Sequence, residues 1–166
     1  MVYVVGCNHG IQRQEPDVLD TPQAIEQRGH FRELISRIVK ENKVQFVGEE
    51  WGLATMTVAH AVADDNGKIP WANINTTNEQ LDAMKIPRGY GSENFATAQK
   101  EQWHRQREEV FIKNLQEQKH NAEKLIVICG FDHFQRLTES LRRICKSVEA
   151  VDYRTMSWYD KDAFTD

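Results

Sequence analysis

The chain has 166 residues, enough for one domain with a substantial hydrophobic core, and its 40% hydrophobic and 28% charged residues are ordinary for a globular protein. A formal net charge of −4 with scattered basic residues argues against nucleic acid as a partner, and no apolar run reaches the ~20 residues that cross a bilayer, which argues against a membrane partner. Three cysteines without CxxC spacing, and an N-terminus that does not resemble a signal peptide, predict reduced thiols and a cytoplasmic protein.

The first third of the chain predicts a strand, a helix and a second strand. Residues 2–5 form an apolar run typical of a buried strand, and residues 10–20 are polar and predict a loop. The helix over residues 21–42 begins with a threonine that can cap it, followed by proline at the first helical position. Residues 44–47 predict the second strand. This order is typical of a βαβ unit with parallel strands.

The rest of the chain continues the alternation of helices and strands. In the middle of the chain we expect a helix over 53–62, a turn at 64–67, a strand over 71–75 and a loop over 87–92. A long helix over 95–120 and a strand over 124–129 follow, and then a helix with Asp132 as N-cap and Gln135 completing a capping box. The chain ends with a strand over 148–153 and a loosely held tail from 155 to 166. The sequence therefore predicts a single α/β domain over residues 1–166, with a mainly parallel central sheet flanked by helices.

Two short sequences match each other in type and context. Gly6-Cys7-Asn8-His9 and Gly130-Phe131-Asp132-His133 each follow an apolar strand. Because parallel strands present their carboxyl ends along one edge of a sheet, His9 and His133 are expected to meet there. Histidine at such an edge is a candidate metal ligand or general base, although a single polar residue at a strand end is also common.

An acidic pair follows the predicted second strand. Successive strand residues point to opposite faces, so only one of Glu49 and Glu50 should face the site. Repulsion between adjacent carboxylates raises the pKa of one of them, which suits a general base. Glu49 lies nearer the strand end and is our first choice, and the alternative is an exposed acidic loop.

The long helix adds two candidates. Arg107 lies four residues after Trp103 and four before Phe111, so it falls on the apolar stripe. An inward arginine needs a carboxylate or an anionic ligand, which predicts substrate or oxyanion binding; the alternative is an arginine that reaches past the stripe to solvent. His104 shares roughly this face and is either a substrate-binding neighbour or a partly exposed helical histidine.

Taken in order, these pieces resemble the TraB/Tiki, ChaN-like and erythromycin-esterase-like superfamily with its two GxxH motifs. The matching sequences are Gly6 to His9, Gly48-Glu49-Glu50, Arg107 to Phe111, and Gly130 to His133. The resemblance implies an α/β fold with the site at the sheet edge, metal-dependent hydrolysis in one branch, esterase chemistry in another and haem binding in a third. Asn75 stands where that family usually has an acidic residue, and Glu108 where asparagine is common.

The sequence thus predicts a metal-assisted hydrolase, protease-like or esterase-like, for a small-molecule or peptide substrate. His9, His133 and Glu49 would hold a divalent ion such as Mn, Co or Zn, which activates a water. Glu49 or Glu50 would act as general base and Arg107 would neutralise the oxyanion. In a metal-free form His9 or His133 is the base. The alternative is a non-catalytic module that binds a ligand, a haem or a protein partner at the same place.

Overall fold

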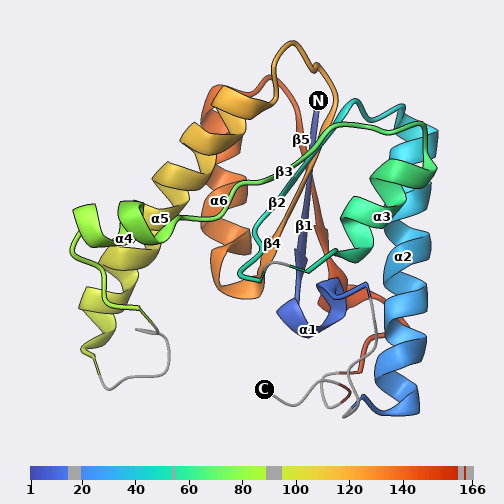
Figure 1. The fold of residues 1–166 in the computed structure, drawn as a ribbon, viewed down its shortest axis with the longest axis horizontal. Coiled ribbons are helices and arrows are strands. Elements are labelled where there is room, and N and C mark those ends of the chain that lie inside the picture. Colours follow the sequence, from blue (N-terminus) through green and yellow to red (C-terminus); the bar gives the residue numbers. More distant parts are fainter. Residues whose placement is uncertain (15–19, 54, 89–94, 161–162, 164–166) are drawn as a thin grey trace.

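The described residues form a five-stranded parallel sheet with helices on both faces, which confirms the predicted α/β class (Figure 1). The computed structural model describes residues 1–14, 20–53, 55–88, 95–160 and 163. The strands lie in the order β3-β2-β4-β1-β5. They are β1 (Val2–Cys7), β2 (Phe46–Glu49), β3 (Trp71–Asn73), β4 (Leu125–Gly130) and β5 (Val148–Asp152).

The helices occupy the connections between the strands. They are α1 (His9–Gln12), α2 (Pro22–Asn42), α3 (Val58–Asp65), α4 (Asn78–Ala83), α5 (Thr97–Gln118) and α6 (Phe131–Ile144), followed after β5 by the 3₁₀ turn η1 (Tyr153–Thr155). Helix α2 begins as predicted, because the Thr21 side chain accepts a hydrogen bond from the backbone N–H of Ala24. No helix among the described residues has the length and apolar character needed to cross a membrane.

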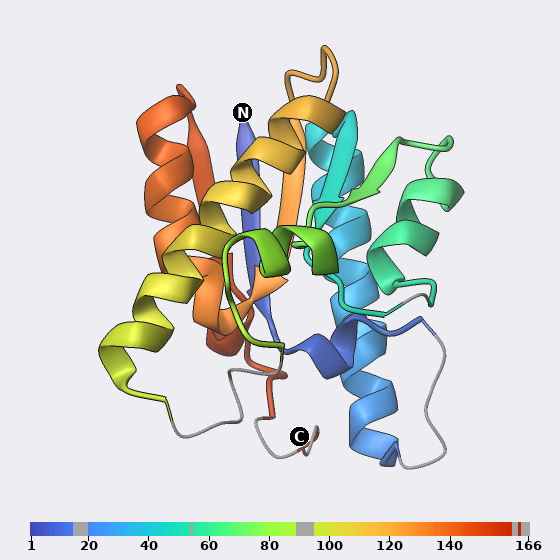
Figure 2. The same ribbon diagram turned by 60° about the vertical axis from the view of Figure 1, so that its left-hand side comes forward.

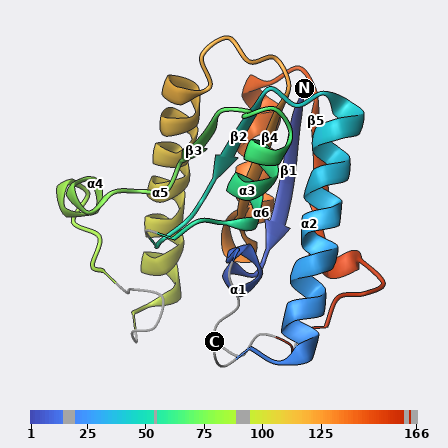
Figure 3. The same ribbon diagram turned by 45° about the vertical axis from the view of Figure 1, so that its right-hand side comes forward.

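Alternation along the strands divides the core between the two faces of the sheet. Tyr3, Val5 and Cys7 of β1 pack under α2 and α3, whereas Val2 and Val4 pack under α5 and α6. Figures 2 and 3 show these two helical layers on either side of the strands. Each large aliphatic side chain buried here contributes roughly 1.5–3 kcal/mol. The central strands β1 and β4 are therefore apolar on both faces, and polar side chains follow where these strands end.

The register places the ends of three central strands together. Cys7 of β1 lies opposite Gly130 of β4, and Glu49 of β2 lies opposite Ile128 of β4. Because all strands run in the same direction, the residues that follow β1, β2 and β4 emerge at one edge of the sheet. This adjacency brings the two Gly-x-x-His sequences and the acidic pair into one region.

Several predicted boundaries differ from the structure. Strand β2 runs two residues later than predicted, because Gly48 and Glu49 pair with the neighbouring strands. The predicted loop over 10–20 contains most of α1, and residues 15–19 of this predicted loop lie outside the described residues. Helix α3 begins at Val58 and not at residue 53, since Thr57 is its N-cap and accepts from the backbone N–H of His60.

The start of α6 also differs from the prediction. Gly130 is the N-cap, Asp132 lies inside the first turn, and Gln135 donates to Glu139 instead of closing a capping box. A capping box occurs at α4, a helix that the sequence did not predict. The end of β4 sets the start of α6, because this helix follows directly from that strand.

The ends of two predicted segments lie outside the described residues, namely 89–92 of the predicted loop and most of 161–166 of the tail. Within the described part of the tail, Trp158 and Tyr159 pack against the core on the side of α2. Trp158 stacks edge to face on Tyr153 with ring centroids 4.7 Å apart. This part of the tail is therefore anchored by aromatic packing.

Candidate functional site

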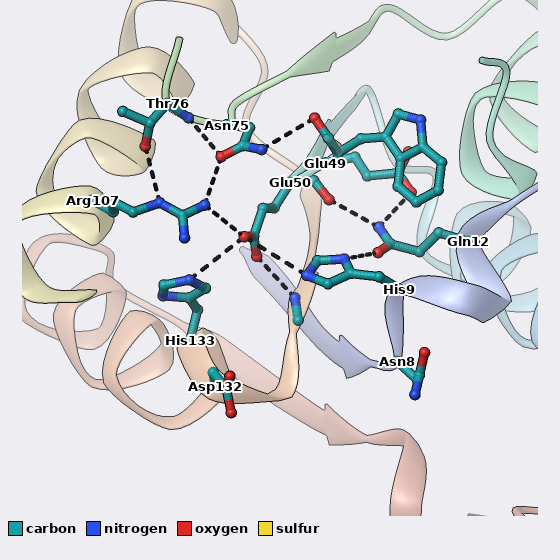
Figure 4. A network of polar contacts seen from close by, with 12 residues as sticks. Asn8, His9, Gln12, Glu49, Glu50, Asn75, Thr76, Arg107, Asp132 and His133 are labelled. Atoms are coloured by element: carbon teal, nitrogen blue, oxygen red, sulfur yellow. Dashed lines mark hydrogen bonds and ion pairs between the residues drawn. The ribbon is translucent and has the colours of Figure 1, made fainter. Parts of the chain in front are cut away.

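The carboxylate of Glu50, buried just beyond β2, is the centre of the candidate site. Its Oε1 lies 3.1 Å from Nη2 of Arg107, 3.5 Å from Nε2 of His133 and 3.9 Å from Nε2 of His9. Its Oε2 accepts a hydrogen bond of 2.9 Å from the backbone N–H of Gly130. Figure 4 shows the two imidazoles approaching this carboxylate from different sides. His9 and His133, more than 120 positions apart in the sequence, thus both lie next to the same oxygen atom of Glu50.

The glycines of the two Gly-x-x-His sequences explain why the motifs fit against each other. A Cβ on Gly130 would lie 2.6 Å from Nε2 of His9, and a Cβ on Gly6 would lie 2.5 Å from Cγ of Phe134. Gly130 therefore makes room for His9 of the other motif, and Gly6 makes room for Phe134, the residue that follows the second motif. The requirement for glycine at these positions comes from space across the β1–β4 pair, because neither residue has a positive φ.

His9 opens the short helix α1 and is half exposed, with 53% of its side chain accessible. Asn8 caps this helix by accepting from the backbone N–H of Gly10 at 2.7 Å. The Nδ1 atom of His9 lies 2.6 Å from Oε1 of Gln12, one turn further on. The ring is thus anchored through Nδ1, and Nε2 faces Glu50.

His133, in the first turn of α6, is buried, with 3% of its side chain accessible. Its Nδ1 lies 2.8 Å from Oε1 of Glu108, a buried carboxylate that also accepts from Nε of Arg136 at 2.9 Å. The ring of His104 meets the His133 ring edge to face at 4.9 Å. Burial, followed by the charges of His133 and Arg136, lowers the pKa of His104. His104 is therefore a neighbour of His133 and does not touch Glu50 through any described contact.

Glu49 points away from the histidines, and its environment is different. Its carboxylate accepts from Nε2 of Gln12 at 2.8 Å, from Oγ1 of Thr57 at 2.5 Å and from Nε1 of Trp71 at 2.9 Å. Burial raises its pKa to about 7 in spite of these three donors. The prediction that only one glutamate faces the site agrees with this geometry, but the one beside the histidines is Glu50, whereas Glu49 was our first choice.

The pKa of Glu50 moves in the opposite direction. Burial alone would raise it, but the charges of His133, His9 and Arg107 and the hydrogen bond from Gly130 outweigh burial, so the pKa is lowered. Glu50 is consequently an ionised acceptor of hydrogen bonds from Arg107 and from the backbone N–H of Gly130. The raised pKa that suits a general base belongs to Glu49, which does not face the histidines.

Arg107 points inward, as its position on the helix stripe predicted. Its Nη2 also donates to Oδ1 of Asn75 at 2.9 Å, its Nε lies 3.4 Å from Oγ1 of Thr76, and its guanidinium lies over the Phe111 ring at 5.2 Å. Asn75 thus accepts a hydrogen bond from the same nitrogen that contacts Glu50.

The fit of a metal ion can be judged from the donor atoms. In the part of the chain that the structure describes, no three His, Cys, Asp or Glu side chains are arranged as ligands of one ion, and Arg107 lies against the carboxylate oxygen that would coordinate it. One feature does match a metal centre: both histidines are held through Nδ1 by an oxygen, as metal-ligating histidines usually are.

Two residues of the site were not predicted from the sequence, namely Gln12 and Glu108. Gln12 lies three positions after His9, which is one helical turn, but residues 10–20 were predicted to be a loop. Glu108 lies four positions after His104 on the helix that carries Arg107, so its inward position could have been read from the same periodicity.

Comparison of this chain with protein-family models, with curated proteins and with solved structures found no match. The function is therefore inferred from the residues of the site.

Proposed function

We propose that the protein is a hydrolase that cleaves an ester or amide bond of a small-molecule or peptide substrate at the Glu50 site. One observation carries this proposal. The Nε2 atoms of His9 and His133 face one buried carboxylate oxygen, while both Nδ1 atoms are anchored by oxygens. Imidazoles oriented in this way are poised for proton transfer at Nε2.

His9 is the residue best placed to meet a substrate, because it is the half-exposed imidazole of the two. As general base it would take a proton from a water that attacks the scissile carbonyl. The ionised Glu50 would stabilise the resulting imidazolium, since opposite charges attract strongly at a buried site. The charge of Arg107 lies on the same side of Glu50 and would favour an anionic substrate group or oxyanion.

His133 has a different part in this proposal. It is enclosed between Glu50 and Glu108, so it orients Glu50 without reaching solvent. General acid–base catalysis by a single positioned group contributes about 10²–10⁴-fold to a rate. We therefore expect His9 to contribute a rate effect of this size, whereas His133 mainly maintains the position and ionisation of Glu50.

A metal-assisted form is the second candidate, favoured by the oxygen anchors on both Nδ1 atoms. His9, His133 and Glu50 would hold a divalent ion such as Mn, Co or Zn. The ion would supply Lewis acidity and lower the pKa of its bound water. Arg107 would then have to give up its contact with Glu50, which is the structural change that distinguishes the two forms.

The resemblance to the TraB/Tiki, ChaN-like and erythromycin-esterase-like superfamily supports hydrolysis in general and leaves both forms open. A non-catalytic module, including one for haem, is the alternative from another class.

The cytoplasm is the compartment we propose, on the evidence of three free thiols: Cys7 and Cys129 lie in different core clusters on opposite faces of the sheet. Alkylation of the unfolded, unreduced protein should label all three cysteines.

The test uses purified protein with p-nitrophenyl esters of increasing chain length and a fluorogenic peptide library. Each assay is run in EDTA and again with Mn, Co or Zn. We expect hydrolysis in EDTA, and a loss of kcat/KM of about 100-fold or more in His9→Ala, with His30→Ala on α2 as control. Arg107→Lys should impair activity, since lysine lacks the planar guanidinium fork, and Arg105→Lys, exposed on the same helix, should not.

The outcomes separate the candidates. Activity that appears only with added metal supports the second candidate and contradicts the first. A Soret band in the absorption spectrum of the purified protein would indicate a haem-binding module. Activity that survives His9→Ala would contradict both hydrolase forms.

A further inference from the structure

A chain of hydrogen bonds connects His9 to the buried interior beside β2 (Figure 4). His9 Nδ1 lies 2.6 Å from Oε1 of Gln12, and Nε2 of Gln12 lies 2.8 Å from Oε1 of Glu49. The other oxygen of Glu49 accepts from the indole N–H of Trp71 at 2.9 Å. Gln12 is fully buried although it lies in a four-residue helix at the surface end of β1. Its side chain is therefore enclosed by partners and has no alternative hydrogen bonds to water.

The partners of Gln12 fix the orientation of its side-chain amide and therefore the direction of these hydrogen bonds. Its Nε2 end faces the Glu49 carboxylate and also the backbone carbonyl oxygen of Glu50, at 3.1 Å. A carbonyl oxygen only accepts hydrogen bonds, so this end of the amide must be the NH₂ group. The opposite end must then be the carbonyl oxygen, and it can only accept from His9. A neutral His9 consequently carries its proton on Nδ1 and a lone pair on Nε2.

We propose that Gln12 is a positioning residue that selects the Nδ1–H tautomer of His9, with Glu49 and the Glu50 carbonyl holding the amide in the required orientation. This inference deepens the proposed function and rests on it for its catalytic consequence. A general base needs its lone pair on the nitrogen that faces the substrate, and Gln12 places that lone pair on Nε2. Glu49, which does not contact either histidine, thereby acquires a role as the anchor of Gln12.

The experiment measures the ring nitrogens of His9 by long-range ¹H–¹⁵N NMR at about pH 8.5, where histidine is mostly neutral. The parent protein is compared with Gln12→Leu, which removes the acceptor, and with Gln12→Glu, which keeps an oxygen in the same place. Gln135→Leu, at an exposed position on α6, is the matched control. Amide spectra recorded on the same samples show whether each variant is folded.

We expect the Nδ1–H tautomer of His9 to dominate in the parent, in Gln135→Leu and in Gln12→Glu, and the Nε2–H tautomer to gain in Gln12→Leu. Once a substrate is known, Gln12→Leu should lower kcat at least 10-fold with little change in KM, and Gln12→Glu should restore part of the loss. A merely structural role for Gln12 would not produce this split.

Two results would overturn the inference. One is a dominant Nε2–H tautomer in the parent protein, which decides the matter even if Gln12→Leu does not fold. The other is a folded Gln12→Leu in which His9 keeps the parent's tautomer. Neither measurement requires activity, so failure of this inference can be distinguished from failure of the proposed hydrolysis.

Discussion

The ends of β1 and β4 carry the same Gly-x-x-His sequence, but the two histidines lie in different surroundings. His9 is half exposed and rests on the neutral amide of Gln12, whereas His133 is buried and rests on the carboxylate of Glu108. Both face Glu50. The comparison teaches that a repeated motif can supply one histidine accessible to solvent and one that belongs to the buried framework, and that the elements packed around them decide which is which.

The largest expected effect comes from the group that both histidines share. Glu50→Ala should lower the free energy of unfolding by about 3–5 kcal/mol, because it removes the buried partner of an ion pair and leaves a partly buried Arg107 without its carboxylate. Chemical denaturation measures this change. Glu109→Ala, at an exposed site on α5, is the control and should change the free energy of unfolding by no more than about 0.5 kcal/mol. Equal stability of the two variants would contradict the placement of Glu50 at the centre of the site.

Glu49, the carboxyl group that contacts Gln12 behind His9, should make the free energy of unfolding depend on pH. Glu49 has a pKa of about 7 in the folded protein and an ordinary value of 4.5 when unfolded. Between these values the folded state binds more protons, so the free energy of unfolding falls as pH rises from about 4.5 to above 7. Glu49→Gln should remove this loss, which amounts to about 3 kcal/mol.

The measurement for Glu49 is the difference in free energy of unfolding between parent and Glu49→Gln at several pH values, with Glu109→Gln as control. The difference should move in favour of the variant as pH increases. A difference that is constant between pH 5 and 8 would show that Glu49 titrates at its ordinary pKa.

Truncating the two histidines should sharpen the comparison directly. His133→Ala should cost about 2–3 kcal/mol, since it leaves a cavity and deprives buried Glu108 of a donor. His9→Ala should cost only about 1 kcal/mol, since its side chain is half exposed. Thermal and chemical unfolding of both variants provide the test, and the reverse order of stability would contradict the assignment of His9 as the accessible residue.

The smallest expected effect comes from the glycines between the motifs. Gly6→Ala and Gly130→Ala should each cost about 1–2 kcal/mol, because the new Cβ meets Phe134 or His9. Gly130→Ala should in addition displace the His9 ring and reduce the proposed hydrolytic activity. Gly29→Ala on α2, where a Cβ meets nothing within 4 Å, should leave stability unchanged or raise it by up to about 1 kcal/mol. Unfolding curves of the three variants, compared side by side, measure these differences.

Much of the fold could be predicted because its signals are local. Apolar runs identified all five strands within about two residues of their observed bounds, and the pair Thr21-Pro22 predicted the start of α2 from capping chemistry alone. The inward direction of Arg107 followed from its spacing with Trp103 and Phe111, since helical periodicity relates a sequence position directly to a face. The start of α3 and the presence of α4 were missed, because short helices with weak apolar periodicity have no comparable signal.

The site depended on tertiary structure for its assignment of roles. The sequence alone made candidates of His9, His133, both Glu49 and Glu50, Arg107 and His104, because the residues at strand ends and on a helix stripe can be identified from local patterns. Which glutamate meets the histidines, which histidine is buried, and which residues support them were decided only by the packing of β1 against β4 and β2. Those properties depend on contacts between separate elements, such as those of Glu50 with His9 and with His133, and no pattern within one strand or one helix contains such contacts.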